Sequence, residues 1–358
     1  MIDELALQFP VKFDLLGYLL SLVQFGFIVG SLTFAILTIV DRFSPSRVFL
    51  ISAILGGLCN LALLIPNIPL VSLLSARFGT GFFLAGIYPV GMKIASDYYK
   101  NGLGKALGYL VGALVLGTAL PHLLKELSWN SDYTTVLVYT SLLSFIGGSL
   151  IHFLIPDGPY RKPVNRFKYS GIIELFANPG FKRASFGYFG HMWELYAFWG
   201  FVPLILKTFR RFHYTELSVP LWSFIVIGIG CISCILGGYI SLRTGSKKVA
   251  QYSLFLSGLL CLCSPFLFKL PEDIFLTLLC IWGMVVISDS PQFSNIVAET
   301  AKPSLRGTGL IIVNCIGYTI TIISIQLLSF LSNTLPPEWI FIFLAIGPVF
   351  GVVALMRR

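Results

Sequence analysis

The sequence contains few charged residues for its length. Asp, Glu, Lys and Arg make up 11% of the 358 residues, whereas hydrophobic residues make up 56% and the mean hydropathy is +0.84. Soluble globular domains carry about 25% charged residues, so this composition cannot cover a water-facing surface. The chain is therefore predicted to be a polytopic membrane protein. Its net charge of +9 does not indicate nucleic-acid binding, because Lys and Arg of membrane proteins gather on the cytoplasmic side.

The sequence also lacks the motifs of enzymes and metal sites. All seven cysteines lie in apolar runs, where cysteine behaves as a small hydrophobic residue. Cys231 and Cys234 form a C-x-x-C pair, but no second pair of ligands follows to complete a metal site. Phosphate-binding loops, paired zinc ligands and nucleophile elbows are absent. We therefore expect no cofactor, no metal and no enzymatic activity.

Long apolar runs are what the sequence has instead. A membrane-spanning helix needs about 20 predominantly apolar residues, and only helices or closed barrels satisfy the backbone in lipid. The alternation of period two that is typical of barrels is absent. The predicted fold is all-α, with eleven transmembrane helices, five before a long break and six after it. The eleven runs are Leu15–Val40, Val48–Ile65, Leu70–Tyr98, Leu103–Leu124, Tyr133–Ile155, Ala184–Leu206, Leu221–Leu242, Val249–Phe268, Ile274–Ala298, Gly309–Ser332 and Trp339–Met356.

The positive charges predict the orientation. About two thirds of the lysines and arginines fall in one alternate set of breaks, which marks the cytoplasmic side. The C-terminus is then cytoplasmic and the N-terminus lies outside, in a plasma (inner) membrane. The stretch "KTFRRFH" at 207–213 is an exception, because it places basic residues on the outer side.

The longest break, residues 156–183, is basic and contains proline. It predicts a cytoplasmic linker between an N-terminal helix bundle, residues 1–155, and a C-terminal helix bundle, residues 184–358.

The two halves repeat a pattern of residues. "DRFSPSR" places Arg42 and Arg47 at the inner end of one helix, and "LRTGSKK" places Arg243 and Lys248 likewise, about 200 residues later. The proline and the acidic residue of "YPVGMKIASD" recur at the same offset in "SPQFSNIVAE". A parallel duplication of this kind is typical of transporters whose binding site lies between the halves.

These motifs resemble those of the major facilitator superfamily over essentially the whole chain. The stretches "RFGTGFFLAGIYPVGMK" and "GHMWELYAFW" are similar to a bacterial subgroup without an assigned substrate. The matching positions are Asp41, Arg42 and Arg47, then Gly238, Arg243, Gly245 and Lys247, and Arg77, Gly81, Gly86, Pro89 and Gly91. The departures are Leu37 and Ser44, where the first copy has glycine, and Leu242, where the second copy has an acid. The resemblance implies a monomeric secondary transporter that moves a small solute by alternating access.

The resemblance also implies twelve helices. The segment before Leu15, "DELALQFPVKFD", resembles the outer loop that follows a first helix. We therefore expect the N-terminal bundle of this chain to lack its first helix. A truncated membrane protein that does not transport is the alternative of another class.

Three ionisable residues lie in the middle of predicted spans. Glu194 and His191 stand one turn apart in "GHMWELYAFW", and Asp289 lies centrally in a later run. Ionisable groups at this depth are costly and tend to be functional, and histidine titrates near neutral pH. We hypothesise that Glu194 is the principal proton carrier, with Asp289 second and His191 tuning or relaying. Alternatively, these side chains form interhelical hydrogen bonds that fix the packing.

Further polar residues lie where a solute would pass. Arg77 and Lys93 give the first half cations, while the second half offers acids, which weakly favours an anionic or zwitterionic substrate. Instead of binding substrate, Arg77 could bind lipid headgroups, and the Lys93 side chain could extend to the inner membrane surface. The candidate substrate-binding residues are Arg77, Lys93, Tyr88, Gln24, Trp193, Tyr196, Gln292, Asn295 and Asn314. The aromatic content of 15% leaves open an efflux pump for amphipathic organic compounds.

The inner ends of the helices carry the charges of a predicted cytoplasmic gate. Its residues are Asp41, Arg42, Arg47, Asp97, Arg243, Lys248 and Glu299.

Overall fold

A computed structural model describes residues 15–99, 103–128, 133–161, 171–302 and 305–356. Within these ranges the regular secondary structure is helical, with no strand. In chain order the helices are α2 (Leu15–Ile36), α3 (Ile39–Arg42), α4 (Pro45–Leu61), η1 (Ala62–Leu64), α5 (Leu70–Leu84), α6 (Tyr88–Tyr98), α7 (Leu103–Leu127), α8 (Tyr133–Leu154), α9 (Gly171–Ala177), α10 (Pro179–His213), α11 (Val219–Gly228), α12 (Gly230–Thr244), α13 (Ser246–Leu267), α14 (Glu272–Ser288), α15 (Ser290–Thr300), α16 (Arg306–Ser332), η2 (Ile340–Ala345) and α17 (Ile346–Met356).

The described helices are long and apolar enough for a membrane protein. Nine segments meet the length and hydropathy of a spanning helix, and Ile340–Met356 is a shorter apolar segment. In addition, α10 has 35 residues, or about 50 Å at 1.5 Å per residue, which exceeds the roughly 30 Å hydrocarbon core. Its glycines and polar residues lower its hydropathy, yet most of the helix is buried. The all-α membrane fold predicted from the sequence is confirmed.

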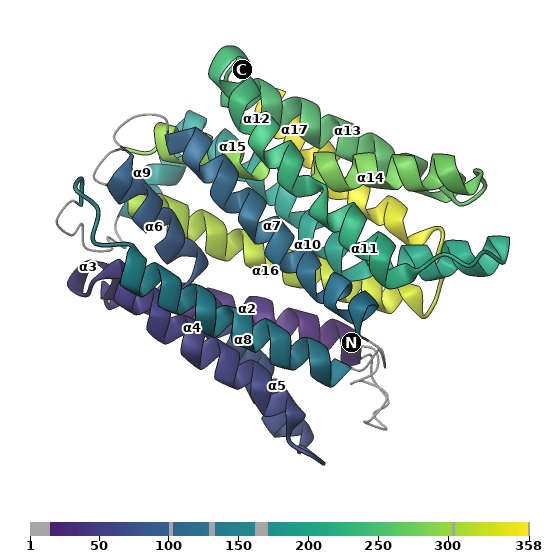
Figure 1. The fold of residues 1–358 in the computed structure, drawn as a ribbon. Helices are drawn as coiled ribbons and strands as arrows, with labels where there is room; N and C mark the ends of the chain where they lie inside the picture. The colour runs from purple at the N-terminus through teal and green to yellow at the C-terminus, as the bar shows by residue number, and fades with distance from the viewer. Residues whose placement is uncertain (1–14, 100–102, 129–132, 162–170, 303–304, 357–358) are drawn as a thin grey trace.

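The helices of the two halves gather into two regions. In Figure 1, α2, α4, α5 and α8 lie together in the lower part, and α10–α17 fill the upper part. Two seams join the regions, because α2 packs along α16 and α7 packs along α11 and α12.

Helix α10 begins earlier than predicted, inside the expected linker 156–183. Asn178 caps it, since its Oδ1 atom accepts hydrogen bonds from the amides of Gly180, at 2.8 Å, and Phe181, at 3.3 Å. Pro179 occupies the first turn, where its missing N–H costs nothing. The linker region also contains the short helix α9, which packs against α10 and α16.

Two predicted spans, Leu70–Tyr98 and Ile274–Ala298, are each divided into two helices. The first breaks between α5 and α6, shortly before Pro89, and the second at Asp289, shortly before Pro291. Proline lacks the amide that would donate to the carbonyl four residues earlier, and its ring crowds that carbonyl. Both breaks fall at matching positions of the repeat, so the two halves share this local geometry. The span Leu221–Leu242 is also divided, at Ile229, where glycine stands on either side.

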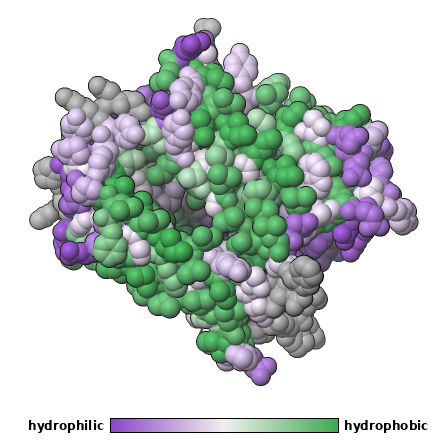
Figure 2. Space-filling model, viewed as in Figure 1, coloured by the Kyte–Doolittle hydropathy of each residue, from purple (hydrophilic) through white to green (hydrophobic). Residues whose placement is uncertain are grey.

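Hydrophobic side chains cover the outside of the bundle. Tyr252 and Phe330, for example, are 69% and 65% exposed. Figure 2 shows hydrophobic residues across the middle of one face and hydrophilic residues mainly towards both ends of the helices. Because no water would meet this band in a bilayer, it is the surface that contacts lipid.

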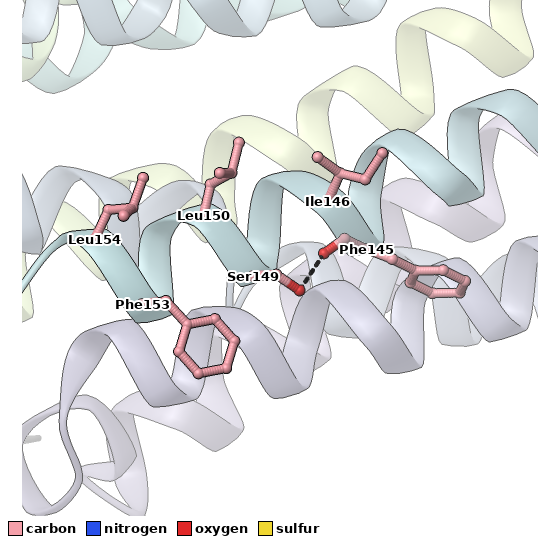
Figure 3. A pocket seen from close by; sticks show the side chains of 6 residues that line it. All are labelled: Phe145, Ile146, Ser149, Leu150, Phe153 and Leu154. Carbon is pink, nitrogen blue, oxygen red and sulfur yellow. Dashed lines mark hydrogen bonds between the residues drawn. The ribbon is translucent and has the colours of Figure 1, made fainter.

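A hollow of about 330 Å³ on α8 belongs to this lipid-facing surface. The side-chain hydrogen bond drawn in Figure 3 joins Ser149 Oγ to the carbonyl of Phe145 within the same helix, at 2.8 Å. Phe153 at its edge is 78% exposed. Since one helix supplies every lining side chain and almost all are apolar, acyl chains suit this hollow better than a polar solute. The lining residues are Phe145, Ile146, Ser149, Leu150, Phe153 and Leu154.

Candidate functional site

A cavity of about 520 Å³ lies between the two halves of the chain. Helices α2, α4, α5, α7 and α8 line it from the first half, and α10, α11 and α16 from the second. Its size falls within the roughly 300–1,000 Å³ typical of pockets for small organic molecules. A site between duplicated halves is the position that the repeat predicts.

The cavity occupies one end of the helices. On α2 its lining runs from Leu16 to Gln24, at the start of the helix, whereas on α7 and α10 it reaches Lys125 and Lys207, near their ends. These antiparallel positions all belong to the end that the sequence predicts to lie outside. The charged inner ends of the helices do not line it.

Basic side chains from both halves line this cavity. Arg77, His122 and Lys125 come from α5 and α7, and Lys207 comes from α10. All four are half-buried, and the Nε atom of Arg77 is buried with no hydrogen-bond partner among the described residues. No Asp or Glu is among the described lining residues. The arrangement therefore places basic side chains from both halves on the walls that a solute would meet.

Hydroxyl and amide groups line the wall formed by the first half. Asn60 organises part of them, because its Nδ2 atom donates to the carbonyl of Leu137 at 3.2 Å, to Thr140 Oγ1 at 3.1 Å and to Ser141 Oγ at 3.0 Å. These bonds hold α4 against α8. The polar, uncharged residues on this wall are Gln24, Asn60, Thr80, Thr118, Thr140, Ser141 and Ser144.

The wall formed by the second half is mainly aromatic and apolar. Tyr196 and Trp199 of α10 pack edge to face, with ring centroids 5.4 Å apart. Trp199 is only 4% exposed, and its Nε1–H has no hydrogen-bond acceptor among the described residues. Tyr196 is fixed from behind by Tyr318 of α16, whose hydroxyl lies 2.8 Å from its own.

A buried polar cluster lies deeper in the second half. The Nδ1 atom of His191 lies 2.9 Å from Oδ1 of Asp289, and both side chains are 0% exposed. This contact is within ion-pair distance, although its angles are not those of a hydrogen bond. Asp289 stands at the break between α14 and α15, which turns it towards α10. Neither residue lines the cavity.

Glu194 lies one turn from His191 and is also fully buried. Its Oε2 atom accepts a hydrogen bond from Ser257 Oγ at 2.7 Å and a weaker one from Cys261 Sγ at 3.5 Å, both on α13. Its Oε1 atom has no partner among the described residues. Two acids and a histidine thus share one sealed region, which is unusual because buried charges are costly unless they are paired.

An aromatic layer separates the cavity from this cluster. We define the layer as Phe27, Tyr188, Tyr196 and Tyr318, which belong to one hydrophobic cluster. The rings of Phe27 and Tyr318 lie 4.3 Å apart across the seam between α2 and α16. On the far side, the ring of Tyr188 lies 5.9 Å from that of His191. Of these four residues Tyr196 lines the cavity, whereas Tyr188 contacts the buried cluster.

Of the nine substrate-binding candidates predicted from the sequence, Gln24, Arg77 and Tyr196 line the cavity. Tyr88 packs against the same hydrophobic cluster as Tyr196 but is not among the lining residues. Trp193 instead donates to the carbonyl of Phe343 at 3.1 Å, on the far side of α10. Gln292 is buried within α15, and Asn314 is half-buried on α16; neither is among the lining residues.

The two remaining candidates lie at the inner ends of matching helices. Lys93 contacts Asp97 at 2.5 Å, one turn along α6. Asn295 donates to Glu299 at 2.9 Å, one turn along α15, and to Ser246 at 3.1 Å. The repeat therefore places a donor and an acid one turn apart in both halves.

The other predicted gate residues are more exposed. Arg42 donates from Nε to Thr38 Oγ1 at 3.0 Å. Arg47, Arg243 and Lys248 are exposed at the ends of helices. The side chain of Asp41 lies outside the described residues.

Sequence reasoning missed His122, Lys125, Lys207 and Trp199 as cavity residues. Lys125 and Lys207 lie near helix ends, where a charge count assigns them to loops. Both residues line the cavity because α7 of the first half packs against helices of the second half. Within the described ranges, no group of three His, Cys, Asp or Glu side chains is placed to hold a metal ion.

Helices that span a membrane, a duplicated architecture and a cavity between its halves together define a membrane transporter. The model of the Major Facilitator Superfamily matches residues 1–325, and the chain belongs to this superfamily. Its members are secondary transporters of small solutes and not enzymes, and this protein is an integral membrane protein with several spans. No curated protein matches the chain.

Proposed function

We propose that this transporter carries a small anionic solute by alternating access and that protons drive it. The observation that carries the proposal is the cavity that Arg77 lines, with His122, Lys125 and Lys207 as further basic residues on its walls. A zwitterion would also need an anionic partner for its ammonium group. Glu194 and Asp289 do not supply one, because both are sealed from the cavity.

The position of Arg77 strengthens the argument for an anion. A guanidinium group in a low-dielectric environment is costly unless an anion pairs with it. Arg77 has a buried Nε–H with no acceptor among the described residues, and it faces a cavity. A carboxylate, phosphate or sulfonate in the cavity would accept from this group, and the planar guanidinium suits such anions.

The buried cluster supports coupling to protons. His191 and Asp289 lie 2.9 Å apart, and the Oε1 atom of Glu194, one turn away, has no hydrogen-bond partner among the described residues. Burial favours the uncharged form of a carboxyl group, and a neighbouring histidine can exchange the proton. The aromatic layer above the cluster would keep this step apart from the solute.

We place the protein in the plasma membrane as a monomer, with the C-terminus in the cytoplasm and the cavity facing outwards. The two rocking units would be the N-terminal bundle, residues 1–155, and the C-terminal bundle, residues 184–358. The family of the chain and its distribution of positive charge support this arrangement.

The test is transport by the purified full chain in liposomes. We expect an inward proton gradient to drive uptake of organic or inorganic anions into the liposomes. In the absence of a gradient, we expect that addition of a transported anion carries protons into the liposomes. Arg77→Gln should lower uptake roughly 10- to 100-fold, because it removes a charge-assisted contact. Arg210→Gln is the matched control, since Arg210 is exposed beyond the cavity and should tolerate the change. Uptake restricted to cations or neutral solutes would contradict the proposal.

Tyr196 and Trp199 favour a second candidate, an efflux pump for amphipathic organic compounds. In that case, expression should protect cells from dyes or antibiotics in a dose-dependent way. Binding without any flux would instead fit a membrane protein that does not transport.

A further inference from the structure

The two walls of the cavity differ in chemistry. The first half contributes Arg77, His122 and Lys125 together with a row of hydroxyl and amide groups. The second half contributes Tyr196 and Trp199, and around them Pro203, Val219, Pro220 and Ile227. Lys207, near the outer end of α10, is the basic residue that this second wall carries among the described lining residues. A solute that filled the cavity would therefore contact charged and hydrogen-bonding groups on one side and an aromatic, apolar surface on the other.

The volume of the cavity argues against a small inorganic anion as its main occupant. About 520 Å³ is space for an organic molecule of many atoms, because pockets that enclose drug-sized ligands start at roughly 300 Å³. A sulfate or phosphate ion would leave the aromatic wall in contact with water. Tyr196 is half-buried and lines the cavity, so an apolar part of the solute would remove its aromatic surface from water.

Trp199 identifies where the apolar part would lie. Trp199 lines the cavity at the base of this wall, and only 4% of the residue is exposed, so its ring is held in place by its neighbours. Tyr196 packs edge to face against it and is itself held by Tyr318, so the wall is rigid. The Nε1–H of Trp199 is buried and has no acceptor among the described residues.

We propose that the solute is an amphipathic organic anion with a flat, apolar or aromatic body. Its anionic group contacts Arg77 and the basic residues of α7, and its body packs on Trp199 and Tyr196. This inference rests on the proposed function, because it adds a flat, apolar or aromatic group to the anionic solute proposed there.

The experiment compares four probes that differ in charge and in the presence of a ring, on the purified full chain. Benzenesulfonate carries both the charge and the ring, methanesulfonate and sulfate carry the charge alone, and benzyltrimethylammonium carries the ring with the opposite charge. Sulfonates stay ionised and do not cross bilayers unaided, so both binding and uptake can be measured. We expect benzenesulfonate to bind about tenfold or more tightly than methanesulfonate, because the ring removes apolar area from water.

Variants of Trp199 test the position of the ring. Trp199→Ala should abolish the preference for benzenesulfonate over methanesulfonate, and Trp199→Phe should retain most of it. Trp339→Ala is the matched control, because Trp339 is 47% exposed and does not line the cavity. A thermal unfolding curve for each variant shows whether it folds. If Trp199→Ala does not fold, the comparison of Trp199→Phe with the unchanged protein still tests the inference.

The outcomes separate this inference from the proposed function. If methanesulfonate and sulfate bind as well as benzenesulfonate, the solute is an anion without a required body, and only the inference fails. The inference also fails if benzenesulfonate does not bind, or if its preference survives Trp199→Ala in a folded protein. If benzyltrimethylammonium is the probe that binds and moves, both the inference and the anionic proposal fail.

Discussion

A buried histidine beside a buried carboxyl group is the most constrained feature at the residue scale. His191 and Asp289 are 2.9 Å apart and have no exposure to solvent, and Glu194 lies one turn away. Three ionisable groups in one low-dielectric region cannot all be charged without large cost. At least one of the three groups is therefore uncharged, and a change in which group holds a proton would change the charge of the cluster.

The amide variants of the acids test this role. Asp289→Asn and Glu194→Gln keep the shape of each side chain but cannot release a proton. We expect each to abolish accumulation driven by a proton gradient while solute exchange without a gradient continues. Uptake and exchange of a labelled anion in liposomes measure both. Full gradient-driven accumulation by both variants would show that the cluster only fixes the packing.

The pair Lys93–Asp97 gives a second test at this scale. Asp97 is 6% exposed in its side chain and Lys93 is 25% exposed, so loss of either partner leaves a charge partly buried. We expect Lys93→Gln and Asp97→Asn each to lower the free energy of unfolding by about 1–3 kcal/mol. The matched substitution Arg243→Gln, at an exposed position, should change it little. If Lys93→Gln leaves stability unchanged but weakens solute binding, Lys93 is a substrate contact, as the sequence alone suggested.

Residue identity and depth predict some of the cavity lining. Gln24, Arg77 and Tyr196 are polar residues within apolar runs, and the structure places all three on the cavity wall. Trp193 and Tyr196 lie on the same helix and looked equivalent, but Trp193 turns to Phe343. Which face of α10 meets the cavity depends on its neighbours α16 and α17, and one-dimensional periodicity cannot report that in a helix buried nearly all round.

At the scale of helices, the repeat is visible in backbone contacts. A Cβ atom on Gly81 would lie 2.0 Å from the carbonyl oxygen of Val23, and one on Gly283 would lie 2.0 Å from that of Val226. The first contact joins α5 to α2 and the second joins α14 to α11. Equivalent helix pairs therefore approach through equivalent glycines, as small residues permit in membrane proteins.

Alanine at these glycines should separate the helix pairs. Because the obstacle is backbone, which cannot move aside as a side chain can, we expect Gly81→Ala and Gly283→Ala each to cost about 1–3 kcal/mol of stability. Gly147→Ala is the control, since nothing lies within 4 Å of its added methyl group. Unfolding of the purified variants in detergent measures the difference. Equal stability of all three would mean that these contacts are looser than described.

Apolar length predicts where helices run, but proline chemistry decides where they break. The sequence predicted Leu70–Tyr98 and Ile274–Ala298 as single spans, with a bend expected at Pro291. The structure divides both, and the second break puts Asp289 at a helix end that faces α10. The extension of α10 back to Pro179 follows from the Asn178 cap, a signal that a hydropathy window does not include.

At the scale of the whole molecule, composition alone predicted the class, and the duplicated motifs predicted where a site would lie. Neither predicted the shape of the cavity. His122 and Lys125 reach it because α7 packs along α11 and α12 of the second half. This placement arises from contacts between segments more than a hundred residues apart, which local patterns do not encode.

The seam between α2 and α16 offers the sharpest test of alternating access. At its outer end, Gln326 donates to Ser21 Oγ at 2.8 Å, and a Cβ atom on Gly17 would lie 3.0 Å from that of Ser329. Rocking of the two halves must separate these positions when the cavity opens fully to the outside. Gly17→Cys combined with Ser329→Cys places two thiols near the Cβ separation of about 3.5–4.5 Å that a disulfide needs, after a small shift.

We expect the double variant to transport solute when reduced and to stop when oxidised, with activity restored by a thiol reductant. Each single variant under the same oxidant is the control, and it also reports on the seven native cysteines. Mass spectrometry of the linked peptides measures how complete the cross-link is. Transport at the uncross-linked rate by fully linked protein would mean that α2 and α16 stay together throughout the cycle. In that event the moving seam would have to lie on the other side of the cavity, between α7 and its partners α11 and α12.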